Sequence, residues 1–292
     1  MKTLKADLCL LGITVLWGAS FPVMSIVLKN KYFLPYSYIA FRNMLAALIM
    51  ALIFHKRFKK INVIAVKGAF LIGISLLLGS IFQVVGLVYT TPSKSGFITG
   101  LNVVFVPVMI AILYKKFPDG KTIFGIILSL IGLGFISING INGINIGDVL
   151  TLLGAICFSS QILFVDRYSR ECDVLLLACL ETFVVGILAF IPAIGVEGLH
   201  IVLNPYSIFA LIFTSVFCSA IAMSVQNKMQ PLTQPTHAAI IYLAEPVFGA
   251  IFSTFIGDAL TGRELLGCAF IFLGMIVLNI KFNFSILKTA NR

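Results

Sequence analysis

Long apolar runs, separated by short polar connections, recur along the whole chain. A helix needs about 20 mostly apolar residues to cross a bilayer, and it satisfies its backbone hydrogen bonds within its own segment, as lipid requires. The runs predict helices over residues 7–28, 34–54, 67–89, 94–114, 121–139, 147–166, 173–194, 206–227, 233–256 and 262–281. We therefore expect an all-α polytopic membrane protein with ten transmembrane helices.

The composition excludes a soluble globular protein. Of the 292 residues, 60% are hydrophobic and 11% are charged, whereas a soluble domain carries roughly a quarter charged residues. The net charge of +10 does not indicate nucleic-acid binding, because the basic residues lie in short clusters between apolar runs. We expect the protein among the lipids of the cell (inner, cytoplasmic) membrane, as a monomer or weak homodimer.

The distribution of basic residues predicts the orientation. With ten spans both termini share one side, and sixteen of the 21 Lys and Arg residues then lie in the termini and connections of that side. Four lie on the opposite side, and Arg42 lies within a span. Cytoplasmic connections carry the excess of Lys and Arg in membrane proteins. Both termini are therefore expected in the cytoplasm.

Three stretches of the first half of the chain resemble three of the second half, in the same order. "DLCLLGITVLWGASF" (7–21) aligns with "DVLTLLGAICFSSQI" (148–162), which places Trp17 on Phe158. The other pairs are "VPVMIAIL" (106–113) with "EPVFGAIF" (245–252), and "GIILSLIGLGFI" (125–136) with "GCAFIFLGMIVL" (267–278). The offsets of 141, 139 and 142 residues are close enough to indicate an internal repeat.

The repeat divides the chain into a first five-helix unit over 1–140, a second over 147–282, and a cytoplasmic tail over 283–292. Because five is an odd number, the second unit must enter the membrane upside down relative to the first. Inverted repeats of this kind recur in secondary transporters, where the substrate site lies near mid-membrane between the halves and access alternates. The organisation of the chain thus favours a transporter.

Four segments carry a recognisable pattern: "LWGASFP" (16–22), "AFRNMLAAL" (40–48), "GLVYTTPSKSGFITGLNVVFVPV" (86–108) and "AAIIYLAEPVFGAIFSTFIGDALTGRELLGCAFIFLGMIVL" (238–278). In these segments the chain resembles the EamA-type members of the drug/metabolite transporter superfamily, over nearly its whole length. The resemblance implies ten helices, cytoplasmic termini, a central cavity, and fifth and tenth helices that act as peripheral supports. It also implies export of small metabolites such as amino acids.

Three ionisable side chains lie well inside the predicted spans: Arg42, Glu181 and Glu245. Such groups are costly in a membrane and usually face the bundle interior or a wet cavity. The repeat places Arg42 and Glu181 at equivalent positions, where they could line a cavity, hold a zwitterionic substrate or exchange protons. The alternative is a structural Arg–Glu ion pair, or an Arg42 side chain that extends to the membrane surface.

Glu245 is followed at once by Pro246, in the middle of an apolar run. Proline cannot donate a backbone hydrogen bond, which leaves a carbonyl near Tyr242 free to line a cavity. Pro107 is the equivalent proline of the first repeat, and Val106 precedes it instead of a carboxylate. We therefore interpret the proline as architectural and Glu245 as a binding or proton-carrying residue, against the alternative of a neutral glutamic acid bonded to a neighbouring helix.

Six uncharged side chains complete the predicted substrate site. They are Trp17, Ser20, Gln83, Asn102, Gln161 and Tyr242. A tryptophan away from the membrane interface suits stacking against an organic substrate, although simple packing is the alternative. The amides could equally form hydrogen bonds between helices, each worth under about 2 kcal/mol.

The motifs of ATPases and hydrolases are absent: the sequence contains no GxxxxGK[ST], HExxH or GxSxG. We expect no enzyme, no cofactor and no bound metal, and a partner that is a small organic metabolite, together with protons or another coupling ion. The predicted function is a secondary active exporter of metabolites such as amino acids. An importer or facilitator of a vitamin, nucleotide-like compound or drug is the alternative, and a membrane enzyme or scaffold acting on lipid is a further rival.

The predicted orientation can be tested with reporter fusions to the full chain. A fluorescent protein at the C-terminus should fluoresce, whereas alkaline phosphatase there should stay inactive because it folds only outside the cytoplasm. The same phosphatase inserted after Asn30, in the first outer connection, should be active. The reverse pattern at either position would contradict the predicted orientation.

Overall fold

The computed structural model describes residues 2–90, 95, 98–137, 145–256 and 261–279. These residues form helices and connections without a β-strand, and one isolated bridge pairs Phe33 with Ile201. The tail predicted over 283–292 lies outside the described residues. The described part of the chain is therefore all-helical, as the sequence predicts.

The helices follow the predicted apolar runs closely. The first half holds α1 (Lys2–Lys29), α2 (Pro35–Phe54), the 3-10 helix η1 (His55–Lys60), α3 (Val63–Tyr89), α5 (Asn102–Tyr114) and α6 (Gly120–Ser137). The second half holds α7 (Ile146–Tyr168), α8 (Val174–Gly195), α9 (Pro205–Phe213), the π-helix η2 (Thr214–Ile221), α10 (Ala222–Met229), the 3-10 helix η3 (Gln230–Leu232), α11 (Pro235–Tyr242), α12 (Ala244–Ser253), the 3-10 helix η4 (Thr254–Ile256) and α13 (Gly262–Asn279).

Seven helical stretches of the described chain are long and apolar enough to cross a membrane. They are Thr3–Lys29, Pro35–Lys60, Val63–Gly86, Ile146–Tyr168, Val174–Gly195, Pro205–Leu232 and Pro235–Phe252. Shorter apolar helices cover Ile98–Tyr114 and Gly120–Phe135. Many large apolar side chains on these helices are exposed, as a surface that faces lipid requires. The molecule is a multi-pass membrane protein.

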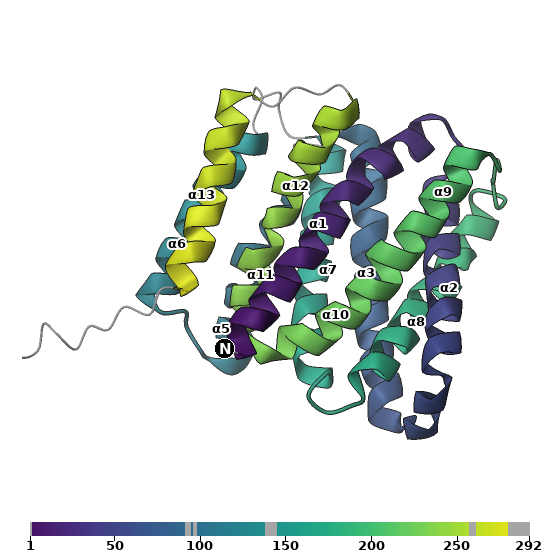
Figure 1. Ribbon diagram of the computed structural model, residues 1–292, viewed down its shortest axis with the longest axis horizontal. Helices are drawn as coiled ribbons and strands as arrows, with labels where there is room; N and C mark the ends of the chain where they lie inside the picture. The colour runs from purple at the N-terminus through teal and green to yellow at the C-terminus, as the bar shows by residue number, and fades with distance from the viewer. Residues whose placement is uncertain (1, 91–94, 96–97, 138–144, 257–260, 280–292) are drawn as a thin grey trace, which may run out of the picture.

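The two halves of the chain interdigitate. The most extensive contacts join α3 to α7, α6 to α13, α2 to α8, α3 to α8, and α1 to α12, and each of these pairs takes one helix from each half. In the α2–α8 and α6–α13 pairs, each helix meets its own counterpart from the other repeat. Figure 1 shows α6 and α13 side by side at one edge of the molecule, away from α2, α8 and α9. This is the peripheral place that the resemblance implies for the fifth and tenth helices.

Small residues allow the closest helix contacts. A Cβ atom added at Gly132 of α6 would lie 2.5 Å from the carbonyl oxygen of Gly267 in α13, and one at Gly274 would lie 2.8 Å from that of Gly125. Lipid supplies no hydrophobic drive between helices, so close van der Waals packing must hold them together. The glycines of the third repeated segment thus hold the outer helix pair together.

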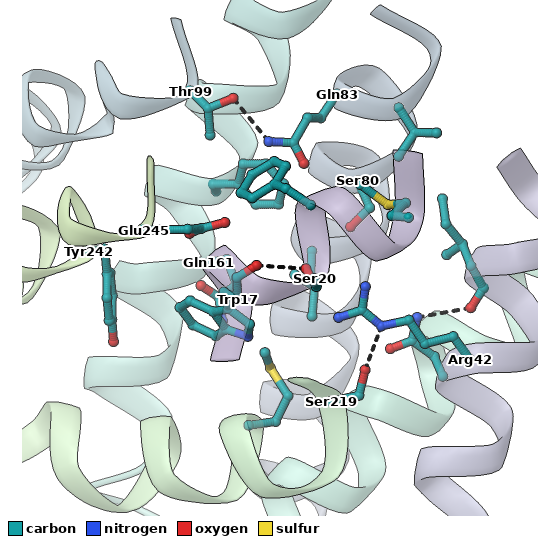
Figure 2. A pocket seen from close by; sticks show the side chains of 18 of the residues that line it. Trp17, Ser20, Arg42, Ser80, Gln83, Thr99, Gln161, Ser219, Tyr242 and Glu245 are labelled. Atoms are coloured by element: carbon teal, nitrogen blue, oxygen red, sulfur yellow. Dashed lines mark hydrogen bonds between the residues drawn. The ribbon is translucent and has the colours of Figure 1, made fainter. Parts of the chain in front are cut away.

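Three predicted spans differ from the expected single helices. The span over 94–114 is interrupted by a turn at Leu101, just before α5. The span over 206–227 contains the π-helix η2 between α9 and α10, and the span over 233–256 is broken at Leu243, between α11 and α12. The break at Leu243 lies three residues before Pro246, which cannot donate a hydrogen bond to the Tyr242 carbonyl. The interruptions at η2 and Leu243 border the cavity of Figure 2, which Ser219 of η2 and Tyr242 of α11 help to line.

The α2–α8 pair is tied at both ends by carboxylates. Beyond the end of α8, Glu197 accepts hydrogen bonds from the backbone N–H groups of Tyr36 and Ser37, at 2.8 and 2.7 Å, and so caps α2 from the other repeat. The Ser37 hydroxyl donates a third bond at 2.7 Å. The carboxylate stands at a helix N-terminus, where the helix dipole stabilises a negative charge.

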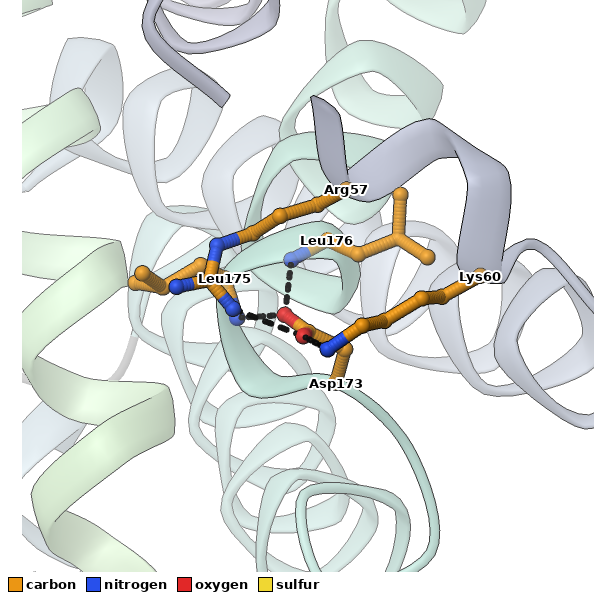
Figure 3. Close-up of polar contacts among 5 residues, drawn as sticks. All are labelled: Arg57, Lys60, Asp173, Leu175 and Leu176. Carbon is orange, nitrogen blue, oxygen red and sulfur yellow. Dashed lines mark hydrogen bonds and ion pairs between the residues drawn. The ribbon is translucent and has the colours of Figure 1, made fainter. Parts of the chain in front are cut away.

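At the other end of this pair, Asp173 caps α8 by accepting hydrogen bonds from the backbone N–H groups of Leu175 and Leu176. Its second oxygen pairs with Arg57 at 2.7 Å and Lys60 at 3.0 Å, both in η1 (Figure 3). Burial alone would raise the pKa of Asp173, but the hydrogen bonds from Lys60, Leu176 and Arg57 outweigh it and lower that pKa. The negative form of Asp173 therefore stabilises the fold.

Asp173→Asn should remove the ion pairs and keep the cap, because asparagine is as good an N-cap as aspartate. We expect a loss of up to about 1 kcal/mol at neutral pH, since the Arg57 side chain is partly exposed and the Lys60 side chain is mostly exposed. The Asp173 pKa is lowered on folding. Its contribution is therefore present above the ordinary aspartate pKa of about 3.9 and lost as the pH falls through the folded-state value.

Thermal unfolding of the purified protein across this acidic range is the measurement. The wild type should have a higher Tm than Asp173→Asn at neutral pH, and this difference should disappear as the medium becomes acidic. Asp166→Asn, which removes only a local pair with Arg170, serves as the control. A Tm difference that stays constant down to the most acidic pH would show that the ion pairs contribute nothing.

Candidate functional site

A cavity of about 160 Å³ lies between the two halves of the chain. Its walls come from α1, α2, α3, α5, α7, η2, α10, α11 and α12, and Thr99 adds to them just before α5. Eight of the nine predicted site residues line it: Trp17, Ser20, Arg42, Gln83, Asn102, Gln161, Tyr242 and Glu245. Phe158, the repeat counterpart of Trp17, lines it as well.

Two opposite charges face this cavity from different halves. Figure 2 shows Arg42 of α2 and Glu245 of α12 on opposite sides of the view. The two groups form no ion pair with each other within the described chain. The cavity therefore offers separate sites for a negative and a positive group.

Arg42 is held in place by the π-helix. Its Nε donates to the Ser219 hydroxyl at 2.9 Å, and its Nη2 donates to the Cys218 carbonyl at 3.4 Å. These bonds leave Nη1 without a protein acceptor among the described residues, in a fork that matches a carboxylate. The sequence leaves open whether Arg42 lines a cavity, pairs with Glu181 or extends to the membrane surface. In the structure its side chain lines the cavity.

The Cys218 carbonyl, which Arg42 contacts, also holds Trp17 in place. Its Nε1 donates to the Cys218 carbonyl at 3.0 Å, and its ring meets that of Tyr242 edge to face, with 5.6 Å between centroids and 61° between planes. Such aromatic pairs favour one geometry over simple apolar contact. The π-helix thus positions an aromatic side chain and a charged one together, in keeping with the frequent place of π-helical turns at functional sites.

A chain of hydrogen-bonded amides and one hydroxyl group includes Tyr242 of the aromatic pair. Gln161 of α7 donates to Gln226 of α10 at 3.3 Å, and Gln226 donates to Gln230 at 3.1 Å. The Tyr242 hydroxyl also donates to Gln230, at 2.9 Å, and Gln230 donates to the Ile162 carbonyl at 2.6 Å. All four polar side chains are buried, and their bonds join α7, α10 and α11 across the cavity wall.

The remaining predicted polar residues differ in whether protein groups satisfy their hydrogen-bonding atoms. Gln83 donates to the Thr99 hydroxyl at 3.0 Å, whereas the Ser20 hydroxyl donates to the Trp17 carbonyl of its own helix at 2.7 Å. The buried Oδ1 of Asn102 has no partner among the described residues. An unsatisfied buried acceptor costs about 1–3 kcal/mol, so Asn102 has a lone pair to offer to a ligand or water.

Glu181 does not meet the expectation that it lines the cavity. Its side chain is wholly buried, and its Oε1 accepts a hydrogen bond from Asn227 of α10 at 2.8 Å. It makes no ion pair with Arg42, which bonds to η2 instead. Because α8 is apolar on nearly every side, its sequence alone could not show which neighbour the Glu181 face would meet.

Several cavity residues escaped the sequence analysis. Ser219, Gln226 and Thr99 line the cavity and hold predicted residues in place. Serine and threonine are common in membrane helices for packing alone, so only their neighbours reveal a role. Gln226 carried a weak signal, because "SVQNKMQ" (224–230) is a polar stretch at the end of an apolar run.

The comparisons with known proteins agree with this fold. The model of the EamA-like transporter family matches the chain twice, over residues 4–138 and 145–280. An uncharacterized transporter of Archaeoglobus fulgidus is 33% identical over 96% of this chain and 88% of its own length. The uncharacterized transporter YyaM of Bacillus subtilis is 25% identical over 94% of each chain. A crystal structure with a TM-score of 0.75 covers 99% of both chains at 15% identity, which shows the shared fold.

The fold and the cavity between two repeats define a multi-pass transporter of the cell membrane. The chain belongs to the EamA-like transporter family, and the two matched segments are its two repeats.

Trp17 is the single tryptophan of the chain and lies in the cavity wall, so its fluorescence reports on the cavity alone. A small molecule that enters the cavity should change the Trp17 emission in a saturable way, because the indole ring would exchange its surroundings for ligand. Titration of the purified protein with a panel of amino acids measures this, and Trp17→Phe should remove the signal. A compound that raises the Tm of the protein but leaves the Trp17 emission unchanged would place its binding elsewhere.

Proposed function

We propose that this protein is a secondary active transporter that exports small organic metabolites, such as amino acids, across the cytoplasmic membrane by alternating access. In this proposal ten helices form two inverted halves, over 1–140 and 147–282, with both termini in the cytoplasm. The coupling ion is a proton or another ion. The substrate binds in the cavity between the halves.

The arrangement of Arg42 and Glu245 carries the proposal. Both charges face one cavity, and neither is neutralised by a partner of the described chain. Unpaired charges in a membrane interior are costly and are kept for function. A zwitterion satisfies both, with its carboxylate on the Arg42 guanidinium and its ammonium group on the Glu245 carboxylate.

The size and the walls of the cavity also suit an amino acid. A cavity of roughly 150 Å³ holds one benzene molecule, and the present one measures about 160 Å³. Trp17, Phe158 and Tyr242 supply aromatic surface for a side chain. Gln83, Asn102 and Gln161 supply donors and acceptors, a mixture typical of small-molecule sites.

The breaks in the helices support alternating access. Discontinuous helices at the interface of inverted repeats form the substrate sites of several transporter folds, and here the interruptions at η2 and at Leu243 adjoin the cavity. A broken helix can bend where its hydrogen-bond ladder is already interrupted. We expect the helix segments on either side of these breaks to tilt when the cavity changes the side to which it opens.

Transport by membrane vesicles tests the proposal. Everted vesicles that contain the protein should accumulate a labelled amino acid from the panel, because export in the cell becomes uptake in this orientation. Arg42→Ala and Glu245→Gln should each weaken the apparent affinity by roughly 10- to 100-fold, since a hydrogen bond to a charged group is worth about 1.5–3 kcal/mol.

Matched control variants remove the same groups at the surface. Arg170→Ala and Glu264→Gln delete an exposed guanidinium and an exposed carboxylate away from the cavity and should transport normally. Full transport by Arg42→Ala and Glu245→Gln at normal expression would overturn the site. Uptake into right-side-out vesicles, without uptake into everted ones, would overturn export and favour an importer.

A further inference from the structure

Glu181 is a carboxyl group that the cavity does not use. It lies seven residues after the start of α8, about 10 Å along the helix, and its side chain has 0% exposure. Oε1 accepts one hydrogen bond, from Asn227 Nδ2 at 2.8 Å, and Oε2 has no partner among the described residues. A charged carboxylate with one donor would be strongly destabilised in such a place.

No basic side chain of the described residues forms an ion pair with Glu181. The elements packed against α8 are α2, α3, α10, η1 and η2. The ionisable groups on these elements and on α8 itself include Arg42, Arg57, Lys60, Lys67, Lys228, Cys179 and Cys218. None of these groups forms an ion pair with Glu181. A carboxyl group buried without a basic partner is stable when a bound cation neutralises it.

The neighbours of Glu181 favour a proton over a metal ion. Asn227 turns its NH₂ group toward the carboxyl group and uses its carbonyl to accept a bond from the Ser169 hydroxyl at 2.9 Å. A hard metal cation takes about six or more oxygen ligands, and the described chain contains no cluster of three His, Cys, Asp or Glu residues that could hold one. A proton needs only the carboxylate oxygen itself.

A polar path leads from the end of α7 to this carboxyl group. Ser169 is the C-cap of α7, and it bonds to Asn227, which bonds to Glu181. The next residue, Arg170, carries an exposed side chain, so the path begins at the surface. Asn227 also donates to the Met223 carbonyl at 3.0 Å, and the Met223 side chain lines the cavity.

Helix α10 connects the two sites mechanically. Its consecutive residues Gln226 and Asn227 point to different partners, Gln226 to Gln161 at the cavity and Asn227 to Glu181. A movement of α10 that carries Gln226 away from Gln161 carries Asn227 with it, because the two residues are adjacent in one helix. The two sites therefore share one structural element.

We propose that Glu181 is the proton-binding site of this transporter, separate from the substrate cavity and held in place by Asn227 of α10. The carboxylate takes up one proton to become the neutral acid, and it releases the same proton when α10 moves relative to α8. This inference rests on the proposed function for its role in coupling, whereas the presence of the buried acid can be tested without any transport.

Infrared difference spectroscopy of the full chain in lipid, recorded between alkaline and acidic media, tests the proton site. The wild type should show the carbonyl band of a buried carboxylic acid, and Glu181→Gln should lose it. Glu171→Gln, which removes an exposed surface carboxylate, and Glu245→Gln should both retain the Glu181 band. A spectrum of Glu181→Gln identical to that of the wild type would overturn the proposal.

A second variant keeps the test decisive if Glu181→Gln does not fold. Asn227→Ala removes the only donor to the carboxyl group among the described residues, so the band should move to the higher frequency of an acid with fewer hydrogen bonds. A band that stays at the wild-type frequency would overturn the assignment to Glu181.

Coupling is then measured in proteoliposomes with a trapped pH-sensitive dye and the standard amino acids as a mixed probe. Glu181→Gln should keep the exchange of labelled for unlabelled amino acid and lose the proton flux that accompanies net transport. Proton flux equal to that of the wild type would overturn the coupling role. Absence of exchange in the wild type would instead refute the proposed function, while the infrared result would still stand.

Discussion

The cost of placing charge and hydrogen-bonding groups inside a membrane is the constraint on which this structure depends. Backbone groups meet it by forming helices, and the buried side chains meet it by bonding to one another. The Cys218 carbonyl illustrates this, because it accepts hydrogen bonds from both Trp17 and Arg42. Arg42, Glu245 and Asn102 keep hydrogen-bonding groups that no protein group of the described chain satisfies, and these three residues line the cavity.

Packing decides where that cavity can exist. Glycines bring α6 against α13, and they bring α3 against α7, where a Cβ atom at Gly147 would collide with the Gly86 carbonyl. These contacts leave no space between the helices. The cavity lies among α1, α2, α3, α5, α7, η2, α10, α11 and α12, beside the interruptions at η2 and Leu243.

The two repeats share a backbone plan but differ in their chemistry. Trp17 and Phe158 are equivalent and both line the cavity, so their aromatic character is common to the halves. Val106 stands where the second repeat has Glu245, and Arg42 corresponds to the buried Glu181. A symmetric site would present the same groups to both ends of a substrate. In the function that we propose, this asymmetry lets the halves bind opposite ends of a zwitterion and leaves one carboxyl group for a proton.

The sequence alone determined that the chain is a helical membrane protein with two related halves. Apolar run length and the repeat depend only on local residue order, and the boundaries of the helices follow the runs to within a few residues. It also singled out eight residues that share one cavity, because polar groups in apolar runs are rare and must converge. Tertiary structure alone decided that Glu181 faces α10 instead of the cavity, that Arg42 bonds to Ser219, and that Gln226 joins the site. These outcomes depend on which faces of nearly uniformly apolar helices meet, and periodicity does not encode that choice when every face is apolar.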